Sequence, residues 1–215
     1  MRLLNVQRLA VGQLLANCFV AKTAENSAVV IDPGDEAERI CAYLDKNGLT
    51  PGKILLTHGH FDHMNAAAQI AEKYGISVYI HEGDAQMLTD PEKALAYFIP
   101  DFPYHAVNDF ITVKEGDKIE QDGYTFEVWS TPGHSKGSAC YVCGDESFAG
   151  DTVFCGSVGR TDLYSGDRKE QIASLERLAG LEGDYVLYCG HGENTTFTVI
   201  RGSPVICSPS TRSTS

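Results

Sequence analysis

The sequence predicts an α/β fold in which two β-sheets are packed between layers of helices. Three observations indicate this fold. Strands and helices alternate in the first half of the chain, strands dominate the middle, and a helix followed by a strand closes it. With 215 residues, 43% of them hydrophobic, the chain is also long enough to bury a large core.

The first half predicts alternating buried strands and helices. Short apolar runs such as AVVID and KILLT are typical of buried strands, and helices commonly end at a glycine, as two of these segments do. The strands are expected at residues 28–32, 53–57 and 77–81. The helices are expected at residues 36–48, 64–75 and 83–88.

From Val107 onward the sequence becomes rich in β-forming segments, separated by turn residues such as Asp122-Gly123 and Pro132-Gly133. Strands are expected at residues 110–113, 124–130, 139–144, 146–150 and 184–190, with a helix at 169–181. These elements predict the second sheet and its covering helix.

The overall charge argues against one class of partner. The 17 basic and 29 acidic residues give a formal charge of −12, whereas binding to nucleic acid normally requires a basic face. The N-terminus lacks an unbroken apolar core, and no later run reaches the length of a membrane span. We therefore expect a cytoplasmic protein that binds neither nucleic acid nor membrane.

The cysteines fit a reducing compartment. Their number, seven, is odd, and they are scattered along the chain rather than arranged as a disulfide framework. Cys140 and Cys143 have the spacing of a zinc or redox pair, but they lie in a strand-like run with no second pair. Packing in the core is the favoured interpretation of these two thiols.

Three histidines and an aspartate lie within six positions, in the sequence HGHFDH. His58 and His60 stand two apart at the end of an extended segment, so both rings can face the same side. Asp62 and His63 follow where the chain turns into a helix. Imidazole nitrogens and carboxylate oxygens are suitable ligands for zinc, manganese or iron. The alternative is a polar loop in which Asp62 caps the helix.

Three more candidate ligands each follow a predicted strand and stand beside a glycine. They are His134 in TPGH, Asp151 in GD and His191 in GHG. Side chains at these positions can converge at one rim of the sheets. Together with the HGHFDH segment, they predict a site for two metal ions.

The motifs HxHxDH, TPGH, GD and GHG resemble those of the metallo-β-lactamase superfamily. The similarity extends from about Asn17-Cys18, through Asp-Pro-Gly at 32–34, to His191. It implies an αββα four-layer sandwich. The expected domain covers residues 1–206, its two αβ halves meet near residues 100–106, and residues 207–215 form a flexible tail.

The resemblance also implies how the ligands are shared. His58, His60 and His134 would hold the first metal ion. Asp62, His63 and His191 would hold the second. Asp151 would bridge the two. Zinc is the expected metal, while iron and manganese stay open because the same ligands accept them.

Within the superfamily, the chain resembles the short glyoxalase II-like branch, whose members hydrolyse thioesters such as hydroxyacyl-glutathione. Asp151 and the segment GxxGRxD at residues 156–162 carry this resemblance. Larger glyoxalase II enzymes have a lysine and a tyrosine near this segment for glutathione, followed by a helical C-terminal domain. Here Arg160 stands in place of the lysine and Thr161-Asp162 offers no tyrosine, so the identity of the thiol stays open.

The expected activity is hydrolysis of a small-molecule thioester by a hydroxide that bridges two metal ions. Asp62 is the expected catalytic residue, since a carboxylate oxygen left free by the metal can accept or orient the hydroxide proton. Arg160 is the expected contact to an anionic substrate, and an ion pair with Asp162 is its structural alternative.

Other members of the superfamily are alternatives. The mononuclear-iron persulfide dioxygenases share HxHxDH, TPGH and GRTD, but their last motif differs from the GHGEN of this chain. A β-lactamase, a tRNA-processing nuclease and a non-catalytic metal-binding module rank lower.

Two further features leave alternatives open. Asp32 is expected either to bind a ligand histidine or to form a turn. Four aromatic residues between the halves either line a substrate groove or pack within a loop. They are Tyr97, Phe98, Phe102 and Tyr104.

Overall fold

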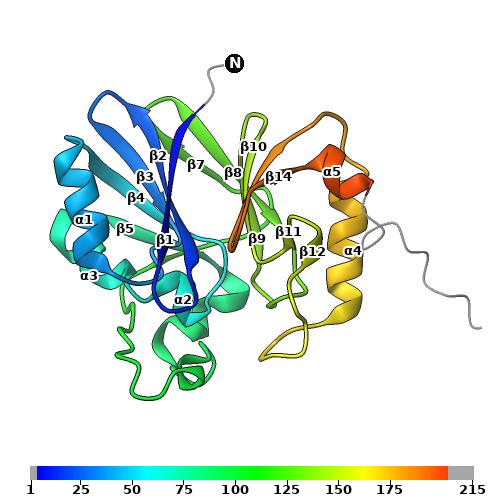
Figure 1. Ribbon diagram of the computed structural model, residues 1–215, viewed down its shortest axis with the longest axis horizontal. Helices are drawn as coiled ribbons and strands as arrows, with labels where there is room; N and C mark the ends of the chain where they lie inside the picture. Colours follow the sequence, from blue (N-terminus) through cyan, green and yellow to red (C-terminus); the bar gives the residue numbers. More distant parts are fainter. Residues whose placement is uncertain (1–3, 203–215) are drawn as a thin grey trace, which may run out of the picture.

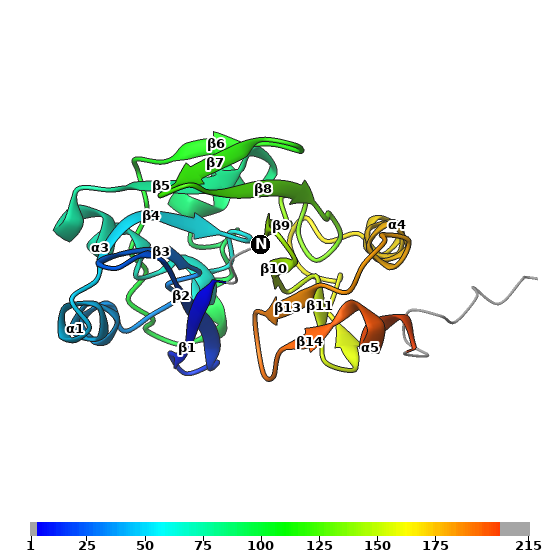
Figure 2. The same cartoon turned by 90° about the horizontal axis from the view of Figure 1, so that it is seen from above.

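The computed structural model describes residues 4–202 as two six-stranded sheets packed against each other, with helices on both outer faces (Figures 1 and 2). This is the αββα four-layer sandwich that the sequence predicts. Residues 203–206 of the expected domain and the expected tail at 207–215 lie outside the described residues.

The first sheet contains six strands in chain order. They are β1 (Asn5–Val11), β2 (Ala16–Ala24), β3 (Ser27–Ile31), β4 (Thr50–Leu56), β5 (Ser77–His81) and β6 (Ile111–Val113). The first three strands are antiparallel, and β3 to β6 run parallel. The β1–β2 hairpin was not predicted, because β1 is a half-exposed strand at the sheet edge and its apolar and polar residues do not form a clear pattern.

The second sheet has the order β14-β13-β10-β9-β8-β7. Its strands are β7 (Lys118–Gln121), β8 (Tyr124–Ser130), β9 (Ala139–Cys143), β10 (Glu146–Gly150), β13 (Val186–Cys189) and β14 (Thr195–Thr196). Only the β10–β13 pair in this sheet is parallel. A small ribbon of β11 (Val153–Phe154) and β12 (Ser157–Val158) follows β10.

The passage between the sheets follows β6. This strand, expected as part of the second half, pairs with β5 in the first sheet, so the chain crosses at residues 114–117. The expected meeting point at residues 100–106 lies before this crossing, in the connection between the 3₁₀ helix η2 (Ala96–Phe98) and β6.

Helices form the two outer layers. On the first sheet lie α1 (Ala37–Lys46) and α3 (Ala67–Tyr74), and on the second lie α4 (Arg168–Ala179) and α5 (Phe197–Arg201) (Figure 2). Gly75 ends α3 with a φ of 66°, a left-handed conformation that glycine adopts at little cost. A single turn, α2 (Phe61–Met64), and the 3₁₀ helices η1 (Glu82–Thr89) and η2 (Ala96–Phe98) complete the chain. The helix predicted at residues 83–88 is therefore a 3₁₀ helix.

Three buried clusters hold the layers together. Ile40 and Ile70 belong to the cluster beneath α1 and α3, Phe126 belongs to the one between the sheets, and Leu175 and Phe197 belong to the one beneath α4 and α5. Each sheet is thus apolar on both faces, as the continuous hydrophobic runs predicted. Within residues 4–202, none of the helices combines the length and apolar character that a membrane span requires.

Cys140 and Cys143 confirm the expectation of core packing. Both are buried in β9 and neither forms a disulfide. The two thiols belong to clusters on opposite faces of the second sheet, because neighbouring positions in a strand alternate.

Candidate metal centre

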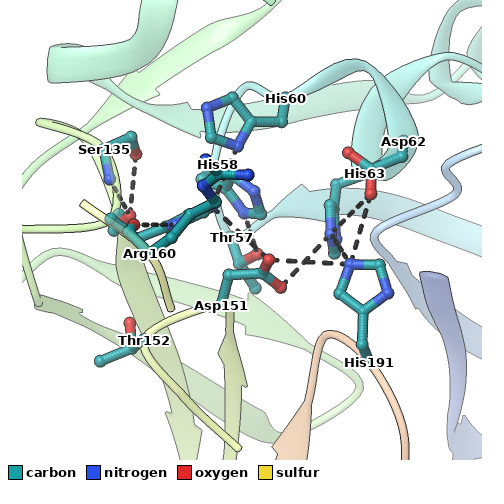
Figure 3. A network of polar contacts seen from close by, with 12 residues as sticks. Thr57, His58, His60, Asp62, His63, Ser135, Asp151, Thr152, Arg160 and His191 are labelled. Carbon is teal, nitrogen blue, oxygen red and sulfur yellow. Dashed lines mark hydrogen bonds and ion pairs between the residues drawn. The ribbon is translucent and has the colours of Figure 1, made fainter. Parts of the chain in front are cut away.

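The seven predicted ligands converge at one edge of the sandwich, where β4, β8, β10 and β13 end (Figures 1 and 3). Strand ends on the same side of paired sheets place the following residues near one another, and two contacts fasten the halves together there. Ala139 N–H donates to Thr57 O at 2.9 Å, and Ala16 forms a β-bridge with His191. The converging residues are His58, His60, Asp62, His63, His134, Asp151 and His191.

The candidate ligand atoms fall into two groups, each with its atoms within 4.8 Å of one another. The first group is His58, His60 and His134. The second group is Asp62, His63 and His191. These are the same two sets that the resemblance implied. In the first group, His134 Nε2 lies 3.0 Å from His60 Nδ1, and in the second, His63 Nε2 lies 3.2 Å from His191 Nε2.

Asp151 stands between the two groups (Figure 3). Its Oδ2 atom lies 3.5 Å from His134 Nε2 and 3.6 Å from His191 Nε2. Its Oδ1 atom lies 3.4 Å from His63 Nε2. One carboxylate therefore faces nitrogen atoms of both groups, the position required of a residue that bridges two metal ions.

Backbone carbonyls fix the ring orientation of two histidines. His134 Nδ1 lies 2.7 Å from the carbonyl oxygen of Arg160, and His191 Nδ1 lies 3.2 Å from that of Leu14. A carbonyl can only accept, so each Nδ1 carries a proton and donates it. Each Nε2 then has a free lone pair directed into the site, as a metal ligand must.

Asp32 fixes the other side of the centre. Its carboxylate accepts from the backbone N–H and the hydroxyl of Thr57, and His63 Nδ1 lies 3.1 Å from its Oδ2 atom. Because the Thr57 hydroxyl donates its proton to Asp32, the oxygen accepts from His58 Nδ1 at 3.1 Å. Asp32 therefore binds a ligand histidine, one of the two predicted alternatives, and it also adopts a turn-like φ of 49°.

Asp32, His58 and His63 also satisfy the distance criterion for a metal group. Thr57 and His63 Nδ1 already occupy the oxygens of Asp32. We therefore assign Asp32 as a partner of the histidines rather than as a ligand.

Unpaired polar atoms test whether the residues fit a metal. Six buried side-chain atoms have no hydrogen-bond partner among the described residues, and three of them, Ser147 Oγ, Gln171 Oε1 and Thr195 Oγ1, lie outside the candidate ligands. The other three are His58 Nε2, His60 Nε2 and Asp151 Oδ1. Buried polar atoms are rarely left unpaired, because each costs free energy. All three belong to candidate ligands, so metal ions would supply the missing partners, and the donor set fits zinc, iron or manganese.

Two histidines of the first group are held in the neutral form. Burial, and then the neighbouring His63, holds the pKa of His58 well below its usual value. Burial and His134 lower the pKa of His60 to about 3. Neutral imidazoles are the form that binds a metal.

The second group lies among carboxylates. Burial opposes a charge on His63, but Asp62, Asp151 and Asp32 outweigh it and raise its pKa to about 10. Burial likewise disfavours a charged Asp62, yet the neighbouring His63 and His191 lower its pKa. Three carboxylates around one histidine constitute an excess of negative charge, which either a proton or a metal cation neutralises.

Arg160 contributes its backbone carbonyl to the centre, while its side chain lies on the exposed surface. Its guanidinium donates to both oxygens of Asp162, at 2.7 and 2.8 Å, on the exposed surface. The ion pair with Asp162, the structural alternative to a substrate contact for Arg160, is therefore present. The role of its carbonyl could not be predicted, since every residue carries the same group.

Of the four aromatic residues between the halves, Tyr97 and Phe98 are exposed, whereas Phe102 and Tyr104 pack within their loop. Phe102 stacks edge-on against Phe61 with ring centroids 4.7 Å apart, and the hydroxyl of Tyr104 donates to Met87 O. Phe102 also borders a small hollow beside Asp62, whose cavity volume of about 10 Å³ is that of a single water molecule. Packing within the loop, one of the two predicted alternatives, therefore applies to Phe102 and Tyr104, and a substrate groove stays a prediction.

The sequence model of the metallo-beta-lactamase superfamily matches residues 11–191, and the chain belongs to this superfamily. Hydroxyacylglutathione hydrolase GloC of Haemophilus influenzae is 32% identical, over 90% of this chain and 93% of its own. The crystal structure of BLEG-1 B3 metallo-beta-lactamase is 31% identical, with a TM-score of 0.88 over 94% of this chain and 99% of its own. The structure of TTHA1623 in a di-iron-bound form is 36% identical, with a TM-score of 0.81 over 92% of this chain and 98% of its own.

Proposed function

We propose that this chain is a metal-dependent hydrolase that cleaves small-molecule thioesters with two divalent metal ions. The observation that carries the proposal is Asp151, whose carboxylate faces His134 of the first group and His63 and His191 of the second. Similarity to a relative named hydroxyacylglutathione hydrolase, over nearly the full length of both chains, supports the thioester as substrate.

Two metal ions in this centre would supply a water of lowered pKa and a Lewis acid for the thioester carbonyl. The protein residues orient these components. The carbonyl oxygens of Arg160 and Leu14 and the carboxylate of Asp32 keep the ligand histidines in the required tautomers. Asp62 holds one carboxylate at the mouth of the second group, where it can accept the proton of the attacking water.

The leaving group needs little help from the protein. A thiol has a pKa of about 8.5, so it departs largely as a thiolate near neutral pH. Leu14 and Phe102, at the rim of the small hollow beside Asp62, offer apolar surface to the acyl group. We assign no protein nucleophile.

Zinc is the proposed metal, with iron and manganese as alternatives that the same donors accept. The di-iron form of a structure 36% identical in sequence supports iron as the first of these alternatives. Anomalous scattering at the metal absorption edges of the purified protein would identify the element. The buried free cysteines fit a reducing compartment, so we propose a cytoplasmic location, and the charge of −12 fits a partner other than nucleic acid.

The activity is tested without oxygen on a panel of thioesters, phosphodiesters, lactones and a β-lactam. We expect release of free thiol from a thioester, loss of turnover with a chelator, and recovery when metal is returned. Oxygen uptake with a persulfide and a single iron would instead establish the dioxygenase alternative. Cleavage of the β-lactam alone would make the chain a β-lactamase. Metal binding without turnover of any substrate would leave a binding module.

A further inference from the structure

Two buried polar residues outside the ligand set hold the loops that carry the ligands. Asp84 lies in η1 and Asn17 lies in β2. Neither contacts the other's loops. Asp84 bonds to the segment that carries His58 and His60 and to the loop that carries His134, but the first of these continues into Asp62 and His63 of the second group. Asn17 bonds to the loop that carries His191. They were not predicted as functional residues.

Asp84 joins the two loops of the first group. Its Oδ2 atom accepts from the backbone N–H of Gly59, between His58 and His60, at 3.0 Å. The same oxygen accepts from the hydroxyl of Ser135, which follows His134, at 2.6 Å, and Oδ1 accepts from Gly137 N–H at 2.7 Å. One carboxylate thus connects the loop after β4 to the loop after β8.

The environment of Asp84 is unusual for a carboxylate. Its side chain is fully buried, and among residues 4–202 no lysine or arginine forms an ion pair with it. Burying an unpaired carboxylate is costly, so the three donors must compensate for its lost hydration. Gly137 makes the approach possible, because a Cβ atom there would lie 2.7 Å from Asp84 Cγ.

Asn17 holds the loop of the second group. Its side-chain amide donates to the carbonyl oxygens of Cys189 and Gly192, both at 2.9 Å, on either side of His191. Its backbone N–H donates to Gly190 O at 2.7 Å. The residue is buried, and its contacts fix three carbonyls of the loop that follows β13.

We propose that Asp84 and Asn17 are positioning residues, each of which sets the metal affinity of one group of ligands independently of the other. Asp84 supports His58, His60 and His134. Asn17 supports His191 and, through it, the second group. The inference rests on the metal centre of the proposed function, but it does not depend on the identity of the substrate.

Reciprocal exchanges of a carboxylate and an amide test the inference. In Asp84→Asn, the side chain keeps its size, but an NH₂ group replaces one of the two accepting oxygens. This NH₂ group then faces an N–H or O–H donor and cannot accept its hydrogen bond. In Asn17→Asp, a carboxylate faces two carbonyl oxygens and repels them. Loss of a partner beside a ligand typically weakens metal binding about 10–100-fold.

The measurement is a titration of the metal-free protein with cobalt(II) and zinc(II) against a competing chelator. Anomalous scattering at one metal equivalent then shows which group is filled. We expect Asp84→Asn to weaken the first group about 10–100-fold and to leave the second within about threefold. We expect Asn17→Asp to do the reverse.

Glu146→Gln is the matched control. Glu146 is also a buried carboxylate, which accepts from Leu4 N–H and the Tyr188 hydroxyl at 2.7 Å each, but it lies at the opposite end of β10 from Asp151. This variant should lose stability without changing either metal affinity. If either exchange prevents folding, a milder variant replaces it. Ser135→Ala removes one hydrogen bond of Asp84, and Asn17→Ser removes the side-chain amide of Asn17.

Equal losses in both groups, unchanged affinities, or the same losses in Glu146→Gln would overturn the inference. A wild-type protein that binds no metal would overturn the inference and the proposed function together. A wild-type protein that binds two metals but cleaves no thioester would overturn only the proposed function.

Discussion

The two groups of ligands differ in how they meet solvent and charge. His134 of the first group has a side chain only 4% exposed, whereas that of His191 in the second is 29% exposed. His58 and His60 are buried and neutral, while His63 is surrounded by carboxylates that raise its pKa to about 10. His58 and His60 are therefore buried and neutral, whereas the second group includes the partly exposed His191 and the carboxylate of Asp62.

Because of this difference, the two groups are suited to different roles. The enclosed group has three nitrogen donors and no solvent-facing carboxylate, so it is suited to holding a metal ion in a fixed position. The open group contains Asp62, which borders the hollow lined by Phe61 and Phe102. Substrate approaching from this hollow would meet the second group first.

The largest effect is expected for Asp151→Asn, because this residue belongs to both groups. Losing the shared negative charge should remove several kcal/mol of transition-state stabilisation, and each 1.36 kcal/mol is about tenfold in rate. We expect kcat/KM for a thioester to fall by about a thousandfold. Asp162→Asn, at an exposed carboxylate, is the control and should retain most of the activity.

The next effect separates the groups directly. His134→Ala and His191→Ala each remove one imidazole, but only His134 is enclosed. We expect His134→Ala to weaken metal binding in the first group about 100-fold, the upper end of the range seen when a hydrogen-bond partner of a ligand is lost. His191→Ala should weaken metal binding in the second group less, because water can take the place of the missing ring. Metal content after dialysis checks this. Equal loss of both metals in both variants would show that the centre is filled only as a unit.

Acid should destabilise the metal-free protein through the first group. Unfolded histidines have a pKa near 6.5, whereas in the folded chain those of His58 and His60 are lowered, so the unfolded state takes up protons first. Stability therefore falls below about pH 6.5. The raised pKa of His63 acts in the opposite sense, but its contribution is complete below pH 6.5 and is lost only as the pH rises from there toward 10.

Between pH 6.5 and 5 we expect the free energy of unfolding to drop by up to about 1.4 kcal/mol per pH unit for each of the two histidines. Urea unfolding in the presence of a chelator at pH 7, 6 and 5 measures this drop. His60→Gln should reduce the slope by about half. A stability that rises on acidification would contradict the neutral state of the first group.

The smallest effect concerns Arg160, whose side chain belongs to neither group. Its guanidinium is exposed and already paired with Asp162, and such surface pairs contribute little. We expect Arg160→Ala to raise KM for an anionic thioester less than tenfold, with kcat nearly unchanged and a weaker dependence on salt. A fall in kcat alone would show that the variant had displaced the Arg160 carbonyl from His134.

Local sequence patterns determined most of the architecture. The strands at β3, β4, β5, β8, β9 and β10 and the helices α1 and α4 were predicted because continuous apolar runs and helical spacing are short-range properties. The candidate ligands could be chosen for a related reason. His134, Asp151 and His191 each follow a strand beside a glycine, and the other four candidates stand together in HGHFDH. Such concentrations of histidine and aspartate are rarely required for packing.

The tertiary structure decided which partners hold these ligands. Asp84 is 25 residues from Gly59 and 51 from Ser135 along the chain, and only the packing of η1 between two loops brings its carboxylate to both. The carbonyls of Leu14 and Arg160 have no sequence signal at all, because every residue has the same backbone acceptor. Their roles depend on where the chain passes, which is set by contacts between residues far apart in the sequence.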